Sequence, residues 1–387
     1  MNDYTTSFFD GKKEWSEIKD TVLSHYIEAY LKKVKKLNRP ILLVDAFAGR
    51  GEFGDGKFGS PLLMLEKAER FAPGNYSAIF VNKESDDHKA LKKAIEFYEK
   101  KECAIAINVD AQTLLNRIKQ RISNHTLFLY IDPFGLKGCD FNILKELLLR
   151  VNKGHSTELL INVMMSSFHR QGAREQVLKY GLKSLSNQTK AKIENVNKAF
   201  GGSEWQKIEW DYNLMKEERE HKIMDQYRKK LNLYIKYVVS CPVRQYEDSQ
   251  VKYYITFCSR HADALILMND TMGKAYNNYM HEKSKERLPL FSASEPDDFY
   301  IWERGRKRQI ERLYTLIPDY IKKFKPRLTR KRLWEEIVVD NFMQFIQKGY
   351  RQTVKRLVEE RKIIPKLIDG SENLNDNSVL YLSSDLN

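Results

Sequence analysis

Short apolar runs alternate with amphipathic stretches over the first two thirds of the chain. The runs cover residues 41–44, 76–83, 104–109, 126–131 and 158–164. Each run has the length and continuity typical of a strand that is buried on both faces. The stretches between them place apolar residues three and four positions apart, which predicts helices over 8–37, 60–72, 88–100, 114–122 and 141–149. Strands that alternate with helices in this way predict a doubly wound parallel sheet of the Rossmann-like α/β class.

The pattern changes after the fifth predicted strand. Residues 168–232 are polar and mostly helical, and they interrupt the alternation as an insertion over the strand tips. Two further apolar runs, 234–243 and 252–258, predict an antiparallel edge to the sheet, and a helix over 262–282 follows. The first predicted domain therefore spans residues 1–282.

A second predicted domain follows a polar, irregular linker at 283–299 and spans residues 300–387. Helices predicted over 308–323, 329–341 and 350–361 precede a hairpin formed by 363–364 and 379–382. Three helices followed by a hairpin are the plan of a winged-helix-like module, whose third helix enters a major groove. Polar residues on or beside that helix are the predicted nucleic-acid contacts: Arg351, Gln352, Lys355, Arg356, Arg361 and Lys362.

Composition supports a polyanionic partner. The chain of 387 residues carries a formal net charge of +14, and residues 303–366 hold 19 Lys and Arg against 8 Asp and Glu. We expect DNA or RNA to be the partner. The alternative for the C-terminal helices is a solvated basic surface that packs on the sheet domain.

Other classes of protein are disfavoured by what the sequence lacks. No apolar run approaches the roughly 18 residues of a membrane span, and the first residues do not resemble a signal peptide, so we expect a cytoplasmic protein without membrane contact. The four cysteines form no CxxC and the histidines no HExxH, so neither a disulfide framework nor a metal site is expected.

Polar residues follow four successive predicted strands. Because the carboxyl ends of parallel strands share one edge, we expect these residues to lie around one crevice. The order of the tips fits S-adenosylmethionine (SAM): a glycine turn for the methionine end, an acid for the ribose hydroxyls, an acid for the adenine amine, and a fourth tip facing the methyl acceptor. The cofactor contacts predicted from this order are Asp45, Gly49, Gly51, Asn82, Glu84 and Asp110.

Alternative nucleotide sites fit less well. The glycine turn satisfies G-x-G-x-x-G, but the next helix starts about nine residues later, whereas in a dinucleotide fold it opens at the glycines. The turn also lacks the lysine of a P-loop. Trp15 and Lys19, ahead of the first strand, are candidates for the roof of the pocket, and His169 is a candidate base that is more often a structural histidine.

Three segments carry a family resemblance. VDAFAGRG at 44–51, IDPFG at 131–135, and FFDGKKEWSEIK at 8–19 with its sequel YIEAYL resemble the three-Cys-motif partner protein family, from Phe8 to about Lys274. The resemblance implies similarity to class I SAM-dependent methyltransferases and a partner protein with a three-cysteine motif that resembles radical-SAM enzymes. It maps Asp45, Phe47, Gly49 and Gly51 onto the first SAM-binding motif, which adds Phe47 to the predicted cofactor contacts. It also maps Asp132, Pro133 and Phe134 onto the catalytic D/N-P-P-Y/F motif of amino-methylating enzymes.

Two departures from that pattern keep a rival hypothesis open. Asn82 stands where the ribose-binding acid is expected, with Glu84 two residues later, and the catalytic motif lacks its second proline. The strand-tip residues, the resemblance and the basic charge still favour a SAM-dependent methyltransferase that acts on nucleic acid, at a base amino group. The alternative is an inactive methyltransferase-like nucleic-acid-binding partner or adaptor; a protein methyltransferase would leave the basic tail without a use.

Overall fold

The computed structural model describes residues 14–122, 124–136, 140–150, 155–244, 249–286, 297–324 and 328–385. The chain forms two compact units, Met1–His261 and Ala262–Asn387. The second unit thus begins ahead of the linker expected at 283–299. Both ends of that linker are helical, and residues 287–296 lie outside the described residues, as do the first six residues of the motif at 8–19.

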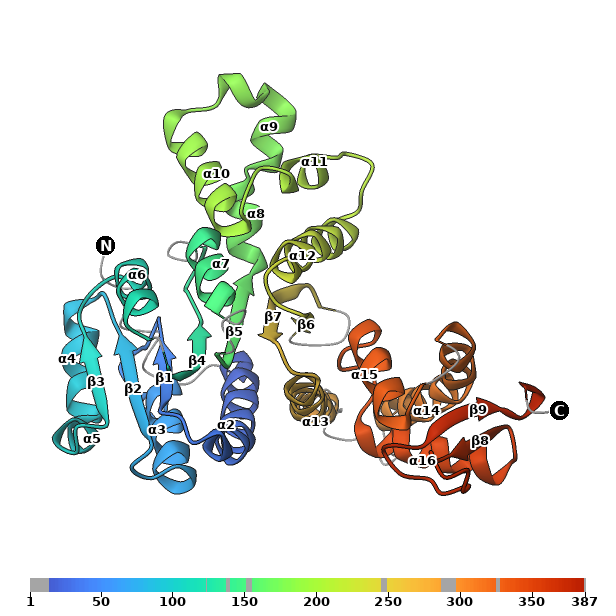
Figure 1. The fold of residues 1–387 in the computed structure, drawn as a ribbon. Coiled ribbons are helices and arrows are strands. Elements are labelled where there is room, and N and C mark those ends of the chain that lie inside the picture. Colours follow the sequence, from blue (N-terminus) through green and yellow to red (C-terminus); the bar gives the residue numbers. More distant parts are fainter. Residues whose placement is uncertain are drawn as a thin grey trace. The chain divides into compact units, whose positions relative to one another are not determined.

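A seven-stranded sheet in the order β3-β2-β1-β4-β5-β7-β6 forms the centre of the first unit (Figure 1). The first five strands pair in parallel, and β7 is antiparallel to both of its neighbours. The strands are β1 (Ile41–Asp45), β2 (Tyr76–Val81), β3 (Ala104–Ile107), β4 (Thr126–Ile131), β5 (Thr157–Met164), β6 (Tyr237–Arg244) and β7 (Val251–Ser259). This order confirms the predicted doubly wound sheet with an antiparallel edge.

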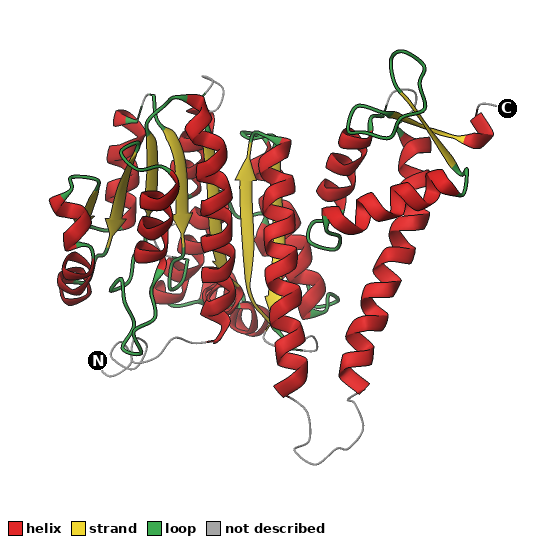
Figure 2. Ribbon diagram, turned by 90° about the horizontal axis from the view of Figure 1, so that it is seen from below, coloured by secondary structure: helices red, strands yellow, loops and turns green. Residues whose placement is uncertain are grey.

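Helices flank the sheet on both faces (Figure 2). They are α2 (Glu14–Val34), α3 (Ser60–Phe71), α4 (Ser85–Ala94), α5 (Glu96–Lys100), α6 (Ala111–Arg121) and α7 (Phe141–Leu149), with the short 3-10 helix η1 (Lys35–Leu37) after α2. Side chains alternate between the faces of β4. Leu127, Leu129 and Ile131 belong to the core shared with α6 and α7, whereas Phe128 packs against Tyr26 of α2. The sheet is therefore buried on both faces.

A helical insertion follows β5, as the sequence predicts. It comprises α8 (Met165–Gly172), α9 (Arg174–Tyr180), η3 (Leu182–Ser184), α10 (Asn187–Phe200), α11 (Trp205–Glu209) and α12 (Lys216–Asn232). Its core is aromatic: Phe168, Phe200 and Trp205 pack with their rings edge-on, 5.1–5.2 Å between centroids. Because α8 starts where β5 ends, the insertion rises from the carboxyl edge of the sheet.

The second unit contains four helices and a hairpin among its described residues. These are α13 (Ala262–Glu286), α14 (Asp297–Lys323), α15 (Arg330–Asp340) and α16 (Gln347–Glu359), with antiparallel β8 (Ile363–Lys366) and β9 (Val379–Leu382), and η4 (Ser383–Asp385). Trp334 stacks on Tyr350 at 4.7 Å, and Asn269 of α13 binds the backbone of Met343 and Phe345. The predicted helices and hairpin are present; the winged-helix assignment stays a prediction.

No helix in the described part of the chain has the length and apolar character needed to cross a bilayer.

The buried contact between α2 and β5 gives a stability test. Tyr26 donates a hydrogen bond to Glu158, whose pKa is raised to about 7 by burial. We expect Tyr26→Phe to lower the free energy of unfolding by about 1–3 kcal/mol, because the Glu158 carboxyl then lacks its donor. Urea unfolding of the two proteins measures the difference.

The pH dependence of the free energy of unfolding provides a second test of the same pair, and it can contradict the assignment. A carboxyl whose pKa rises on folding binds its proton more tightly in the folded state, so its contribution to stability falls as the pH rises from about 4 to about 7. The Glu158→Gln variant, which has no titrating group there, should lose this part of the slope. An unchanged slope would contradict the assignment.

Candidate functional site

The site lies at the topological switch point, between β1 and β4, where the order of the strands in the sheet reverses. The chain runs outward from β1 to β2 and β3, then returns to β4 on the other side of β1, and ligands of such sheets bind outside the strand ends at this point. Two cavities lie here, of about 640 and 300 Å³. Phe47, Gly49 and Phe134 line both of them, so the two cavities adjoin.

Asp45 anchors the loop after β1 rather than lining a cavity. Its fully buried carboxylate accepts hydrogen bonds from the Phe47 backbone N–H at 3.0 Å and from the Ser60 hydroxyl at 2.6 Å. Burial raises the pKa of Asp45 to about 7, against the opposing effect of these two donors. One side chain thus ties the start of the loop to the first residue of α3.

The loop needs glycine at position 51. Gly51 has φ +88°, and a Cβ there would lie 2.9 Å from the Cβ of Ala94 in α4. Its carbonyl accepts the backbone N–H of Gly59, which closes the loop on itself. Arg50 pairs with Asp87 of α4 at 2.6 Å, so the loop is fixed to α4 as well.

Asn82 is engaged in holding the same loop. Its side-chain amide donates to the carbonyls of Ala48 and Gly49, and its oxygen accepts the backbone N–H of Glu84. The amide that stands in place of the expected ribose-binding acid is therefore occupied by the protein itself. Asn82 and Glu84 both line the larger cavity, and Glu84 supplies the carboxylate that Asn82 lacks.

Asp110 lies at the end of β3 and caps α6. Its carboxylate accepts the backbone N–H and the hydroxyl of Thr113, which hold the pKa of Asp110 below its usual range. The side chain is exposed and lines the larger cavity. It is therefore ionised and able to accept further hydrogen bonds from a ligand.

Asp132 lines the smaller cavity and forms an ion pair that the sequence did not predict. Lys19 of α2 donates to Oδ2 at 2.6 Å, and the Tyr130 hydroxyl donates to the same oxygen at 3.3 Å. Asn162 in turn donates to the Tyr130 hydroxyl. Within the described residues, Oδ1 accepts no hydrogen bond. The Lys19 side chain lines this cavity, which is consistent with the prediction that it covers the pocket.

The two residues after Asp132 differ in burial. Pro133 is buried, whereas Phe134 is 62% exposed and borders both cavities. An exposed aromatic ring next to a carboxylate is a suitable surface for a planar ligand. The structure thus brings Asp132, Pro133 and Phe134 together beside the loop that Asp45 holds. The side chain of Trp15 lies outside the described residues.

His169 lies apart from both cavities. Its ring nitrogens bond two buried carboxylates, Glu209 at 2.8 Å and Glu220 at 2.7 Å. Burial opposes protonation, but the two hydrogen bonds outweigh it and raise the pKa of His169 above its usual value. An imidazolium between two carboxylates ties α8 to α11 and α12, so His169 is a structural residue of the insertion.

Carboxylates lie close to several of the predicted nucleic-acid contacts in the second unit. Lys355 pairs with Glu359, and Arg356 with Glu311 and Glu360. Lys362 also lies 3.4 Å from Glu360. Arg351 and Gln352 lie on α16, and Arg361, at φ +54°, follows the helix. The described residues contain no group of three or more His, Cys, Asp or Glu that could hold a metal ion.

Solved structures with a similar arrangement include methyltransferases. The SAM-dependent methyltransferase from Agrobacterium tumefaciens is 11% identical, over 60% of this chain and 61% of that one, with a TM-score of 0.30. A methyltransferase from Geobacter sulfurreducens is 8% identical, over 60% and 78%, with a TM-score of 0.28. Protein LPL1258 from Legionella pneumophila is 8% identical, over 67% and 92%, with a TM-score of 0.38.

No protein-family model matches the chain, and no curated protein matches it in sequence. Because the structural similarities are low, the class of fold rests on the chain's own topology. Five parallel strands with the switch between β1 and β4, and an antiparallel β7 between β5 and β6, define a Rossmann-like fold of the class I methyltransferase type.

The His169 cluster gives a pH-dependent prediction. Because the pKa of His169 is raised on folding, its stabilising contribution is complete below about pH 6.5 and is lost as the pH rises through the raised value. We expect His169→Gln to cost about 2 kcal/mol at pH 6 and less at pH 9. Thermal unfolding across this range measures the difference.

The exposed His221 on α12 provides the matched control, since its pairing with Asp225 at 3.6 Å is at the surface. Its change to Gln should leave stability almost unchanged at either pH. An effect of His169→Gln that stays constant with pH would contradict the charged state of the histidine.

Proposed function

We propose that the protein is a SAM-dependent methyltransferase that acts on a base amino group of nucleic acid. The observation that carries the proposal is the pair of adjoining cavities at the switch point. Acidic residues from two strand ends, Glu84 and Asp110, line the larger one, and Asp132 lines the smaller one.

The larger cavity suits the nucleoside part of SAM. Its volume of about 640 Å³ falls in the range of small-molecule sites. Glu84 and Asp110 would accept hydrogen bonds from the ribose hydroxyls and the adenine amine. When bound, SAM supplies the electrophilic methyl group; the residues of this chain hold and orient it.

The smaller cavity suits the methionine end and the acceptor. Gly59, Ser60 and Pro61 at the start of α3 line it, and a helix N-terminus favours a carboxylate. Gly49 and Gly51 allow a ligand to approach the backbone closely. Phe47 lies between the two parts of the site.

Asp132 and Phe134 would position the acceptor base. Oδ1 of Asp132 would accept an amine N–H of the target, while Lys19 and Tyr130 hold Oδ2. The exposed Phe134 ring would stack on the base. A base in a duplex would first have to leave the stack, because its amino group is otherwise out of reach.

Charge and resemblance support the partners that we propose. The net charge of +14 favours DNA or RNA, with the residues of α16 as sequence-independent contacts. The resemblance to the three-Cys-motif partner family supports a further partner, a protein with a three-cysteine motif.

One observation favours a second candidate, the inactive nucleic-acid-binding adaptor. Lys19 already neutralises the Asp132 carboxylate, and Asn82 is bonded to the loop instead of being available to a ribose. A protein that binds SAM and nucleic acid but transfers no methyl group would match this candidate and contradict the enzyme.

Cofactor binding is tested by titration calorimetry with SAM. We expect micromolar binding by the full chain, and its loss in Asp45→Ala, because the loop is then untied from α3. Asp86→Ala is the matched control, since this exposed aspartate of α4 lines neither cavity. Folded protein that binds no SAM would contradict the proposal.

Catalysis is tested by transfer of labelled methyl groups to DNA and RNA oligonucleotides. Asp132→Ala should lower kcat/KM by about 100-fold through loss of acceptor positioning, and should leave the Kd for SAM within a small factor. Lys19→Met should lower kcat as a positioning residue, with Kd for SAM again retained. Equal loss of SAM binding and transfer would instead place Asp132 among the cofactor contacts.

A further inference from the structure

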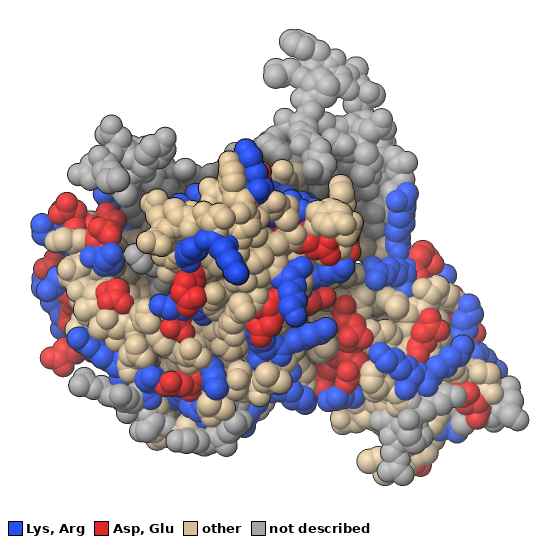
Figure 3. All heavy atoms as spheres, turned by 90° about the horizontal axis from the view of Figure 1, so that it is seen from above, with Lys and Arg blue, Asp and Glu red and all other residues tan. Residues whose placement is uncertain are grey.

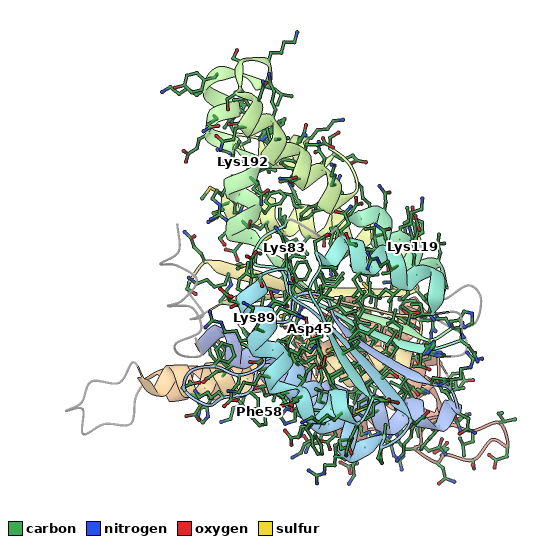
Figure 4. The ribbon with its side chains drawn as sticks, turned by 90° about the vertical axis from the view of Figure 1, so that its left-hand side faces the viewer. Asp45, Phe58, Lys83, Lys89, Lys119 and Lys192 are labelled. Carbon is green, nitrogen blue, oxygen red and sulfur yellow. The ribbon has the colours of Figure 1, made fainter. Side chains whose placement is uncertain are left out.

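A third cavity lies within the insertion, outside the site described above. It has a volume of about 460 Å³ and is lined by side chains of α8 to α12. In Figure 4, Lys192 lies on the insertion, above the sheet edge that holds Asp45 and Lys83. Five of the lining side chains are cationic, namely Arg170, Arg174, Lys192, Lys216 and Arg219, and two are acidic, Glu175 and Glu209.

The acidic side chains do not neutralise this cavity. Glu209 is shared between His169 and Arg219, so its charge is compensated within the cluster. Glu175 is the other carboxylate in the lining. His169 also lines the cavity, but it adds no net charge, because its ring bonds both Glu209 and Glu220. The excess comes from Arg170, Arg174, Lys192 and Lys216. The cavity therefore carries a clear excess of positive charge.

Several of the cations have no carboxylate partner among the described residues. Lys192 forms no hydrogen bond or ion pair there, and Arg170 contacts only the Ser167 hydroxyl, at 3.5 Å. Lys216 donates to the neutral Gln250 side chain. Clustered cations without counter-ions repel one another, and they are stabilised when an oxyanion binds between them.

The surroundings show that this charge is local. Figure 3 looks down on the insertion and shows basic and acidic side chains interspersed over the face, instead of one continuous basic surface. A cavity with unpaired cations is therefore distinct from the general charge of the molecule. The cavity also differs from α16, where the cations Lys355 and Arg356 are paired with glutamates.

Arg170 connects this cavity to the proposed active site. Its side chain lines both the insertion cavity and the larger cavity at the sheet edge. It belongs to α8, which directly follows β5, and Met164 at the end of β5 lines the acceptor cavity. An anion held in the insertion would thus lie beside the larger cavity, which adjoins the acceptor cavity at Phe134.

We propose that the insertion cavity binds the backbone phosphate of a nucleic-acid strand whose base enters the site beside Asp132. This inference rests on the proposed function and adds a location for strand binding within the sheet unit. The guanidinium of Arg170 suits the oxygens of a phosphodiester, and Lys192 and Lys216 supply further charge. Such contacts position a strand without reading its sequence.

The test is the binding of a fluorescent single-stranded oligonucleotide, followed by polarisation over a range of salt concentrations. The variant Lys192→Ala/Lys216→Ala should bind about tenfold more weakly, and its plot of log K against log salt should be shallower by about one. The matched control Lys198→Ala removes an exposed lysine of the same helix α10 that does not line the cavity, and it should bind normally.

Three outcomes would overturn the inference. Unchanged oligonucleotide binding by the double variant, with binding retained by the wild type, would contradict the site and leave the proposed function intact. Absence of oligonucleotide binding by a wild type that binds SAM would contradict both the nucleic-acid substrate and this site. Competition by inorganic phosphate or a nucleoside monophosphate as tight as that of the strand would assign the cavity to a small phosphorylated molecule.

Discussion

The site depends on a buried carboxylate at the end of β1. Asp45 has no access to solvent, and its two donors belong to the start of the loop and to the start of α3. A buried carboxylate without donors would be costly, so Phe47 and Ser60 can adopt few positions other than those observed. The loop between them, with Gly49 at the junction of two cavities, is thereby fixed before any ligand arrives. Asn82 and Arg50 add independent ties to the same loop.

Much of the fold could be predicted because the relevant patterns are local. A continuous apolar run such as 126–131 identifies a strand buried on both faces, and the alternation with helices determines a parallel order. The tips then share one edge whatever the detailed packing, which explains why Glu84, Asp110 and Asp132 could be placed around one crevice from the sequence. Element bounds are predicted less accurately: α14 starts at Asp297, eleven residues before the expected helix.

The contacts that alter the chemistry of the site could not be predicted, because their partners are distant in sequence. Lys19 and Asp132 are 113 positions apart, and only the packing of α2 against the sheet brings them together. The position of Asn82 predicts a contact with the ribose, but its amide hydrogen bonds connect it to the glycine loop. For His169 the sequence leaves a catalytic base and a structural histidine both open, because its two glutamates, 40 and 51 residues away, give no local signal.

Distant contacts also decide which basic residues are available to a ligand, and the net charge of the sequence does not show this. The sequence concentrates Lys and Arg in residues 303–366, yet on α16 the arginine at 356 and the lysine at 355 face glutamates one turn away. Such exposed pairs contribute little to stability, and a nucleic acid would have to compete with them for each cation. In the insertion cavity, Lys192 and Arg170 have no carboxylate partner among the described residues, so a nucleic acid meets no such competition for them. A strand that gains its affinity from released counter-ions therefore gains more per residue there, although the insertion contributes fewer cations than the C-terminal helices.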